Sequence, residues 1–141
     1  IINDYVEESK IISTARNVNN YKSVWCIEKI KNAKLKFELQ FDKKPKIAIM
    51  GLTFKPNVDD LRESPANYIT QEVIEDTADN HYYICEPNIK EHTLFKLTNY
   101  KLAIEKSDIL VLLVAHKEFE NLNIEENKIV LDFCGISKNK I

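Results

Sequence analysis

The strongest constraint on the fold of this chain is an alternation of strand-like and helix-like segments that begins at Lys46. Four short runs are rich in β-branched or aromatic residues: Lys46–Met50, His81–Cys85, Ile109–Val114 and Lys128–Leu131. Helical patterns lie between most of these runs, notably at Ala66–Asp76. Strands that alternate with helices are typical of a mainly parallel sheet covered by helices on both faces, so we predict an α/β fold.

A helical segment precedes the predicted sheet. The pattern is helical from about Asp4 to Leu39, and we expect a break near Asn19 and Asn20. The second half of this segment carries apolar residues at helical spacing, namely Cys26, Ile30, Ala33 and Phe37. Phe41–Pro45 is a short charged connector, which we interpret as a domain boundary.

Composition narrows the class of protein. The 141 residues allow one full domain, and 20 basic and 22 acidic residues are mixed along the chain. This mixture argues against a nucleic-acid or membrane partner, and no apolar run approaches the length of a bilayer span. Three widely spaced cysteines indicate reduced thiols in a cytoplasmic protein. Because the chain lacks an initiator methionine and starts in a helical pattern, we expect it to be part of a larger protein.

The loop after the first predicted strand is dense in charge. Gly51 follows that strand directly, at the sheet edge where ligands bind in open α/β folds. Ser64 and Pro65 are suited to the N-cap and the first position of the next helix. Between them the loop carries Lys55, Asp59, Asp60 and Arg62.

These charges favour an anion site. Lys55 and Arg62 supply cationic donors beside a helix N-terminus, which itself favours anions. Asp59 and Asp60 would brace those cations, or Asp60 would cap local N–H groups. A solvated loop without a ligand fits the spacing about as well. Neither GxGxxG nor GxxxxGK[ST] is present, so the residues alone indicate an anion or nucleotide site and no more.

Other reactive side chains have structural interpretations. Cys134 follows a strand without a partnered base nearby, so we do not expect a catalytic thiol. His116 follows the third strand, where an ordinary loop histidine is favoured over a ligand contact. Glu86 ends the second strand, and without a glycine fingerprint we interpret it as a structural acid. The histidines and cysteines lack metal-ligand spacing, so we predict no metal site.

The charged loop belongs to a longer motif, GLTFKPNVDDLRESPA at 51–66, and three further stretches accompany it: ARNVN at 15–19, EPNI at 86–89 and LVAHKEF at 113–119. Together they resemble the UDP-glucose/GDP-mannose dehydrogenase family, over nearly the whole chain and in the same order. The resemblance is greatest to the members that oxidise UDP-N-acetylmannosamine.

This resemblance implies a Rossmann-like UDP-binding domain at 45–141, preceded at 1–44 by the end of a central helical domain and a connector. The family's enzymes oxidise the C6 alcohol of a nucleotide sugar to a carboxylate with two NAD, and we expect a homodimer through the helical segment. The family's N-terminal NAD-binding unit and its loop with a nucleophilic cysteine are absent from this sequence. We therefore expect the chain alone to be inactive, without a catalytic residue of its own. The alternative is a non-enzymatic α/β nucleotide-binding or dimerisation module.

The resemblance also implies individual site residues. Phe54 and Lys55 match positions that contact the UDP-sugar, and Arg62 matches an arginine that reaches the NAD pyrophosphate from across the domain interface. In the family a basic residue usually follows the aspartate that ends the last strand, but here that residue is Cys134. Lys138 is our candidate for the missing charge.

Overall fold

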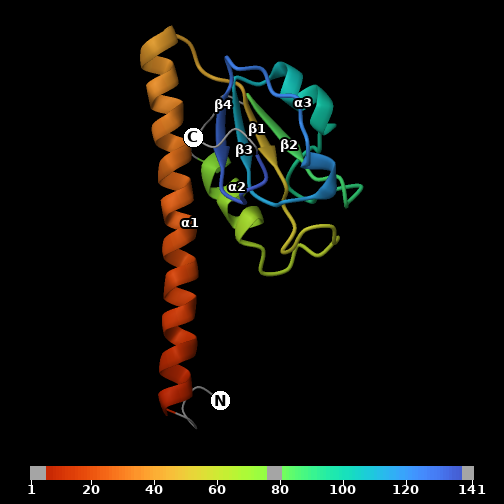
Figure 1. Ribbon diagram of the computed structural model, residues 1–141. Helices are drawn as coiled ribbons and strands as arrows, with labels where there is room; N and C mark the ends of the chain where they lie inside the picture. The colour runs from red at the N-terminus through yellow and green to blue at the C-terminus, as the bar shows by residue number, and fades with distance from the viewer. Residues whose placement is uncertain (1–5, 76–80, 138–141) are drawn as a thin grey trace.

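The computed structural model describes residues 6–75 and 81–137, with side-chain surroundings from residue 20 onward. Along the chain its elements are α1 (Val6–Phe41), β1 (Ile47–Met50), α2 (Pro65–Glu75), β2 (Tyr82–Cys85), α3 (Tyr100–Lys106), β3 (Ile109–Leu112), the 3-10 helix η1 (Lys117–Phe119) and β4 (Ile129–Asp132). Figure 1 shows α1 running along one side of the sheet and extending beyond it. β1, β2 and β3 lie within the runs predicted for them, and β4 extends one residue beyond its predicted run, to Asp132.

The four strands form one sheet in the order β2-β1-β3-β4, and every neighbouring pair is parallel. The two central strands, IAIM in β1 and ILVL in β3, are buried along their whole length, while β2 and β4 at the edges are partly exposed. Continuous apolar runs are expected of parallel strands that are covered on both faces. The predicted α/β fold is confirmed.

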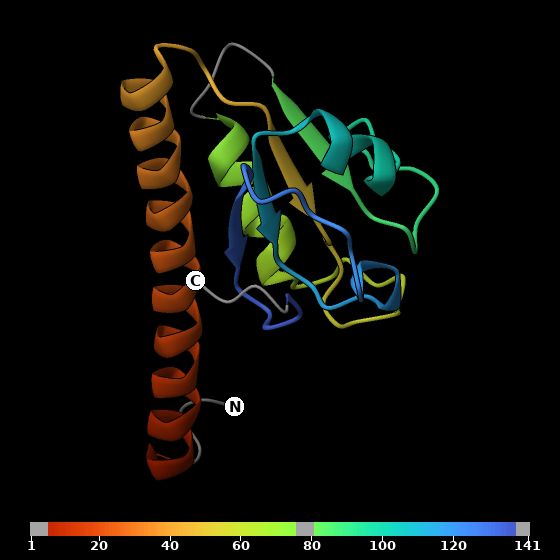
Figure 2. The ribbon, with the colours of Figure 1, turned by 45° about the horizontal axis from the view of Figure 1, so that its top comes forward.

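Side chains of the central strands alternate between two hydrophobic layers, because successive residues of a strand point to opposite faces. Ile47 and Ile49 of β1 pack in a cluster with buried residues of α1 and α2. Ala48 and Met50 pack in a second cluster with residues of α3 and with Phe119. Figure 2 shows α1 and α2 on one side of the sheet and α3 on the other. Helices therefore cover both faces, as predicted.

The predicted break in the first helix is wrong. α1 is continuous for 36 residues and passes through Asn19 and Asn20 without interruption. Asparagine costs a helix only about 0.7 kcal/mol relative to alanine, and propagation of an existing helix is cooperative, so two asparagines without proline or glycine do not end it.

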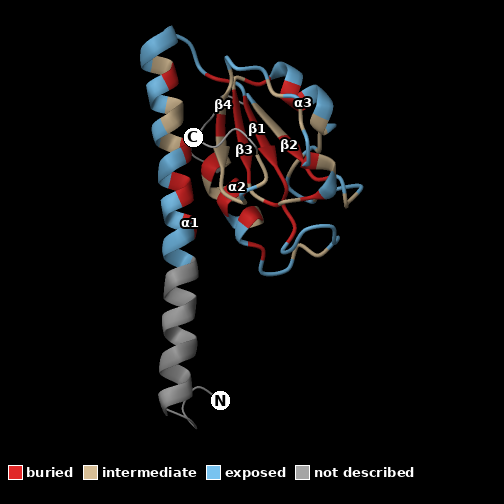
Figure 3. Ribbon diagram, in the orientation of Figure 1, coloured by how far each residue is buried: buried red, intermediate tan, exposed pale blue. Residues whose placement is uncertain are grey.

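The second half of α1 packs on the sheet layer. Cys26, Ile30 and Phe37 are buried in the cluster that contains Ile47 and Ile69, and Figure 3 shows the buried residues of α1 on the side that faces α2. The domain boundary near residue 44 stays a prediction. Within the described residues, no helix is long and apolar enough to cross a membrane.

Candidate functional site

The strand order places a candidate site between β1 and β3. The chain leaves β1 for β2 on one side and then crosses to β3 on the other, which makes this gap a topological switch point. In open α/β sheets the loops after the carboxyl ends of strands form a ligand crevice at this point. A cavity of about 350 Å³ lies there, which is within the range of about 300–1,000 Å³ typical of small-molecule sites.

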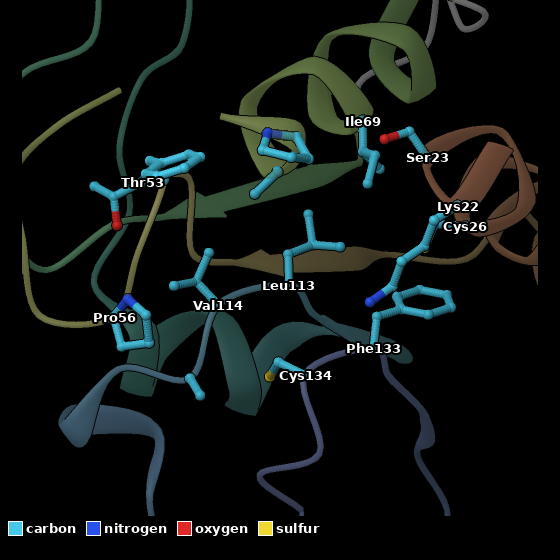
Figure 4. Close-up of a pocket in the computed structure, with 14 residues that line it drawn as sticks. Lys22, Ser23, Cys26, Thr53, Pro56, Ile69, Leu113, Val114, Phe133 and Cys134 are labelled. Carbon is cyan, nitrogen blue, oxygen red and sulfur yellow. The ribbon is translucent and has the colours of Figure 1, made fainter. Parts of the chain in front are cut away.

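Five parts of the fold line this cavity. Thr53 and Phe54 come from the loop after β1, and Pro65 and Ala66 begin α2. The remaining walls come from α1 and from the segments after β3 and β4, and include Lys22, Ser23, Cys26, Leu113, Val114, Ala115, Phe133 and Cys134. In Figure 4 Thr53 and Pro56 lie across the cavity from Lys22 and Phe133.

The cavity is mainly apolar with one cation. Lys22 is the only charged side chain among the described residues that line it. Ile69, Leu113 and Phe133 supply apolar surface, and Phe54 is 49% exposed. The first residues of α2 place the positive end of a helix dipole at the wall. This combination suits a ligand that joins an apolar or aromatic part to a negative charge.

The loop that contains Phe54 is closed on itself. The Phe54 N–H donates to the carbonyl oxygen of Asp60 over 2.8 Å. At its far end the Ser64 hydroxyl oxygen accepts from the Asn67 N–H, so Ser64 caps α2 as predicted. The ammonium of Lys55 lies 5.6 Å from the ring centroid of Phe54, within cation–π distance.

Arg62 is braced by Asp60, as one of the predictions for this loop proposed. Its Nε and Nη2 atoms donate to the two carboxylate oxygens of Asp60 over 3.0 and 3.1 Å. Asp60 also accepts from the Arg62 N–H, which confirms the predicted capping. These hydrogen bonds hold the pKa of Asp60 below its ordinary value. The Arg62 side chain is 89% exposed, and two of the five guanidinium donors are engaged by Asp60.

A buried carboxylate joins the ends of three strands. Glu86, after β2, receives five hydrogen bonds, from Leu52 N, Thr53 N, His116 Nε2 and the backbone and side-chain nitrogens of Asn88. Burial raises the pKa of Glu86, but the hydrogen bonds from His116, Leu52 and Asn88 outweigh it and leave the pKa below its ordinary value. The interpretation of Glu86 as a structural acid is confirmed.

The interpretation of His116 as an ordinary loop histidine is wrong. Its side chain is fully buried, with 0% exposure, and bonds to Glu86 over 2.9 Å. Its other ring nitrogen, Nδ1, accepts from the Asn57 N–H over 2.9 Å. The sequence could not indicate this, because burial of a residue just after a strand depends on which loops fold over it.

Gly51 permits the close approach of the loops after β1 and β3. Its φ angle is +97°, in a region that favours glycine. A Cβ atom at this position would lie 2.6 Å from the Cβ of Val114. A side chain here would therefore press against one wall of the cavity.

The loop after β4 is organised by Asp132 and includes Cys134. The carboxylate of Asp132 accepts from the backbone N–H groups of Cys134, Gly135 and Ser137. Burial, with the charge of Asp132 nearby, raises the pKa of the Cys134 thiol to about 12. This thiol is a poor nucleophile, in agreement with its structural interpretation. Lys138 lies outside the described residues.

The structure thus brings together only part of the predicted site. Phe54 lines the cavity, whereas Lys55 and Arg62 lie on the same loop but are not among its lining residues. Sequence reasoning missed Lys22: helical spacing identified the face of α1 that carries Cys26, but only the packing shows that the turn before Cys26 borders the cavity. In the described part of the chain, no group of three or more His, Cys, Asp or Glu side chains could hold a metal ion.

Comparison with known proteins assigns most of this chain to one protein family. Residues 48–139 match the model described as the UDP-glucose/GDP-mannose dehydrogenase family, UDP binding domain. This match contains most of the residues that line the cavity.

Individual relatives agree with this match. A UDP-N-acetyl-D-mannosamine dehydrogenase of Campylobacter jejuni is 41% identical over 134 residues, which is 90% of this chain and 31% of the relative. An NDP-N-acetyl-D-galactosaminuronic acid dehydrogenase of Ralstonia nicotianae is 35% identical over 96% of this chain and 32% of its own length. The solved structure of a UDP-N-acetyl-mannosamine dehydrogenase from S. aureus has a TM-score of 0.71 at 25% identity, covering 95% of this chain and 31% of that one. The chain therefore spans about a third of the length of these proteins.

Proposed function

Because this chain belongs to the UDP-glucose/GDP-mannose dehydrogenase family, we propose that it is the part of a nucleotide-sugar 6-dehydrogenase that binds the UDP-sugar. The observation that carries this proposal is the cavity at the β1–β3 switch point, most of whose walls lie within the matched region. The alternative, a non-enzymatic module, is not favoured by membership of this family.

The chemistry of the cavity supports a nucleoside diphosphate. Phe54 and Phe133 offer aromatic surface to the base or sugar, and Lys22 offers a cation to the diphosphate. The Lys55 ammonium lies next to the Phe54 ring on the same loop. We propose that it contacts the substrate in the complete enzyme, where the other domains supply the remaining walls of the site. Lys138, outside the described residues, stays a candidate substrate contact.

We propose UDP-N-acetylmannosamine as the substrate of the whole protein, in line with the names of its relatives in C. jejuni and S. aureus. Oxidation of the C6 alcohol to a carboxylate removes four electrons, which corresponds to two hydride transfers and therefore two NAD. NAD and nucleotide sugars are supplied in the cytoplasm, where we place the protein. We assign no catalytic residue to this chain.

Arg62 fits the role of a cofactor contact. Its guanidinium is exposed and oriented by Asp60, and it retains N–H donors for a phosphate group. NAD, when bound, would supply the ring that accepts the hydride. Arg62 would contribute by binding and orienting the cofactor pyrophosphate.

A proposed division of the chain follows from the same family. Residues 45–141 would form the UDP-binding domain, since the family match begins at residue 48. Residues 1–44 would form the end of a helical domain and its connector, because α1 extends beyond the sheet (Figure 1).

A titration with UDP tests the binding proposal. Trp25 is the single tryptophan of the chain, and its ring centroid lies 5.7 Å from that of Phe133 in the cavity wall, so its fluorescence reports on binding. We expect weak binding, because the chain holds only part of the site. Lys22→Ala should weaken it about tenfold, the loss of one charged hydrogen bond.

The matched control for this titration is Lys101→Ala, which removes an exposed lysine from α3 on the opposite face. It should bind UDP as the parent chain does. A folded parent chain that does not respond to millimolar UDP would contradict the proposal, and so would an equal loss in both variants.

Activity and assembly are separate proposals. Incubated alone with UDP-N-acetylmannosamine and NAD, the chain should form no NADH. We also propose a homodimer through α1, whose exposed apolar side chains Tyr21, Val24 and Leu35 would be covered by a second copy. Sedimentation should show a dimer that Leu35→Glu disrupts, and a monomer in both samples would contradict it.

A further inference from the structure

His116 ties the ends of three adjacent strands together beneath the candidate site. It follows β3, its Nε2 atom bonds to Glu86 after β2, and its Nδ1 atom bonds to Asn57 in the loop after β1. The His116 side chain has 0% exposure, so its hydrogen bond to Glu86 is shielded from water, while the bond to Asn57 lies at the edge of the buried region.

The geometry fixes which ring nitrogen carries the proton. The Asn57 N–H is a backbone group and can only donate, so Nδ1 must hold a lone pair. The proton of a neutral imidazole therefore resides on Nε2, where it points to the Glu86 carboxylate at 2.9 Å. Thr53 Oγ1 donates to the carbonyl oxygen of Lys55 and lies 3.3 Å from Nε2, which is consistent with this tautomer.

Asn57 needs such support. Its φ angle is +61°, in the left-handed region, which costs a residue other than glycine free energy. Two contacts hold it there: its N–H on His116 Nδ1, and its side-chain oxygen, which accepts from the Lys117 N–H. His116 contacts Thr53 and Asn57. Phe54 and Pro56, which line the cavity, lie between these two residues in the sequence.

We infer that His116 is a positioning residue for the nucleotide site: through Nδ1 it holds the 53–57 segment in the conformation that presents Phe54 to the cavity. This inference rests on the proposed function for its ligand. It does not require His116 to touch the UDP-sugar.

Two substitutions separate the two ring nitrogens. His116→Gln places an amide N–H where Nε2 was, so it keeps the bond to Glu86 and removes the acceptor for Asn57. His116→Asn places an amide oxygen where Nδ1 was, so it keeps that acceptor and removes the donor to Glu86. His81→Gln, at an exposed histidine, is the matched control.

The variants are compared by amide hydrogen exchange, UDP affinity and thermal unfolding. In His116→Gln the Asn57 N–H and the Asn88 side-chain amide both lose Nδ1 as a partner. We expect the Asn57 amide to exchange about tenfold faster and UDP affinity to fall about tenfold, with a midpoint of unfolding lowered no more than in His116→Asn. In His116→Asn we expect parent-like exchange and affinity with a lower midpoint, because Glu86 loses a donor. His81→Gln should change none of these.

Parent-like exchange of Asn57 in His116→Gln would overturn the inference. A UDP affinity that falls in proportion to the midpoint of thermal unfolding across the variants would also overturn it, because a purely structural role of His116 gives that result. If the parent chain did not bind UDP, the proposed function would fail, while the exchange comparison would still decide whether Nδ1 holds the segment.

The parent chain alone provides a test that depends on no variant. The ¹⁵N chemical shifts of the His116 ring identify the protonated nitrogen. We expect the proton on Nε2 and a lone pair on Nδ1. A proton on Nδ1 would overturn the inference, because Asn57 could then not donate to it.

Discussion

Glu86 illustrates how a single side chain can organise several loops. A buried carboxylate is costly unless it is fully hydrogen-bonded, and here five donors from three sources satisfy it. The Leu52 and Thr53 N–H groups that bond to it are the first part of the loop that carries Phe54. Stability at this residue and geometry at the cavity are therefore linked.

Glu86→Gln should destabilise the fold by about 3 kcal/mol at neutral pH, because an amide cannot accept from all of these donors. The folded-state pKa of Glu86 is depressed, so its contribution to stability is fully present above the unfolded-state pKa and is lost as pH falls through the folded-state value. The difference in unfolding free energy between the parent chain and the variant should narrow below about pH 4. Urea unfolding from pH 7 to pH 3 measures it, and a constant difference would contradict the account.

Gly51→Ala should cost about 2–4 kcal/mol of stability, since φ is +97° and the new Cβ would meet Val114 at 2.6 Å. Gly135→Ala is a matched control, because φ is +77° there but, among the described residues other than its chain neighbours, no atom lies within 4 Å of the added Cβ. The control should cost only about 1–2 kcal/mol. Urea unfolding of both variants checks this, and equal losses would show that the contact with Val114 is unimportant.

At the scale of elements, α1 is an integral part of the hydrophobic layer over one face of the sheet. Ile30 is 1% exposed, whereas Leu39, on the same helix, is 87% exposed. Ile30→Ala should therefore cost about 2–4 kcal/mol, and Leu39→Ala about 0.5 kcal/mol or less. Chemical denaturation of the two variants compares them directly. Similar effects would mean that α1 does not pack on the sheet as described.

The sequence predicts elements well where a pattern is regular. The runs IAIM and ILVL indicate buried strands because their residues are continuously apolar, and Ser64-Pro65 indicates a helix start because both residues suit one. The predicted break at Asn19 and Asn20 is wrong because cooperative propagation of the helix outweighs the weak helix propensity of two asparagines.

In the candidate site, the sequence predicts a contact within one loop, but it does not predict the contacts that join separate loops and helices. The bond between Asp60 and Arg62 joins residues two positions apart, so the sequence places them together. Lys22 reaches the cavity and His116 reaches Asn57 only through tertiary packing, 59 positions apart in the second case. No pattern in a single sequence encodes such a contact.

At the scale of the whole molecule, the chain spans about a third of the length of its relatives. In our proposal the loop after β1 would contact two ligands, the sugar nucleotide through Lys55 and NAD through Arg62. In the complete enzyme, Lys55→Ala should mainly raise the Michaelis constant for the sugar nucleotide, and Arg62→Ala mainly that for NAD. Each change should be about one to two decades, the effect of one charged hydrogen bond. Steady-state kinetics in which each substrate is varied in turn separates them. If both variants affected only the sugar nucleotide, the two-ligand role of the loop would be wrong.

The central claim is that the cavity at the β1–β3 switch point binds the nucleotide, and mapping of amide chemical shifts during a UDP titration tests it most directly. The account predicts that the largest changes fall on residues that line the cavity, such as Phe54, Ala66, Val114 and Cys134. Residues of the separate cavity beyond β2, such as Ile89 and Leu97, should not change. Changes centred on Ile89 and Leu97, or none anywhere at millimolar UDP, would contradict it.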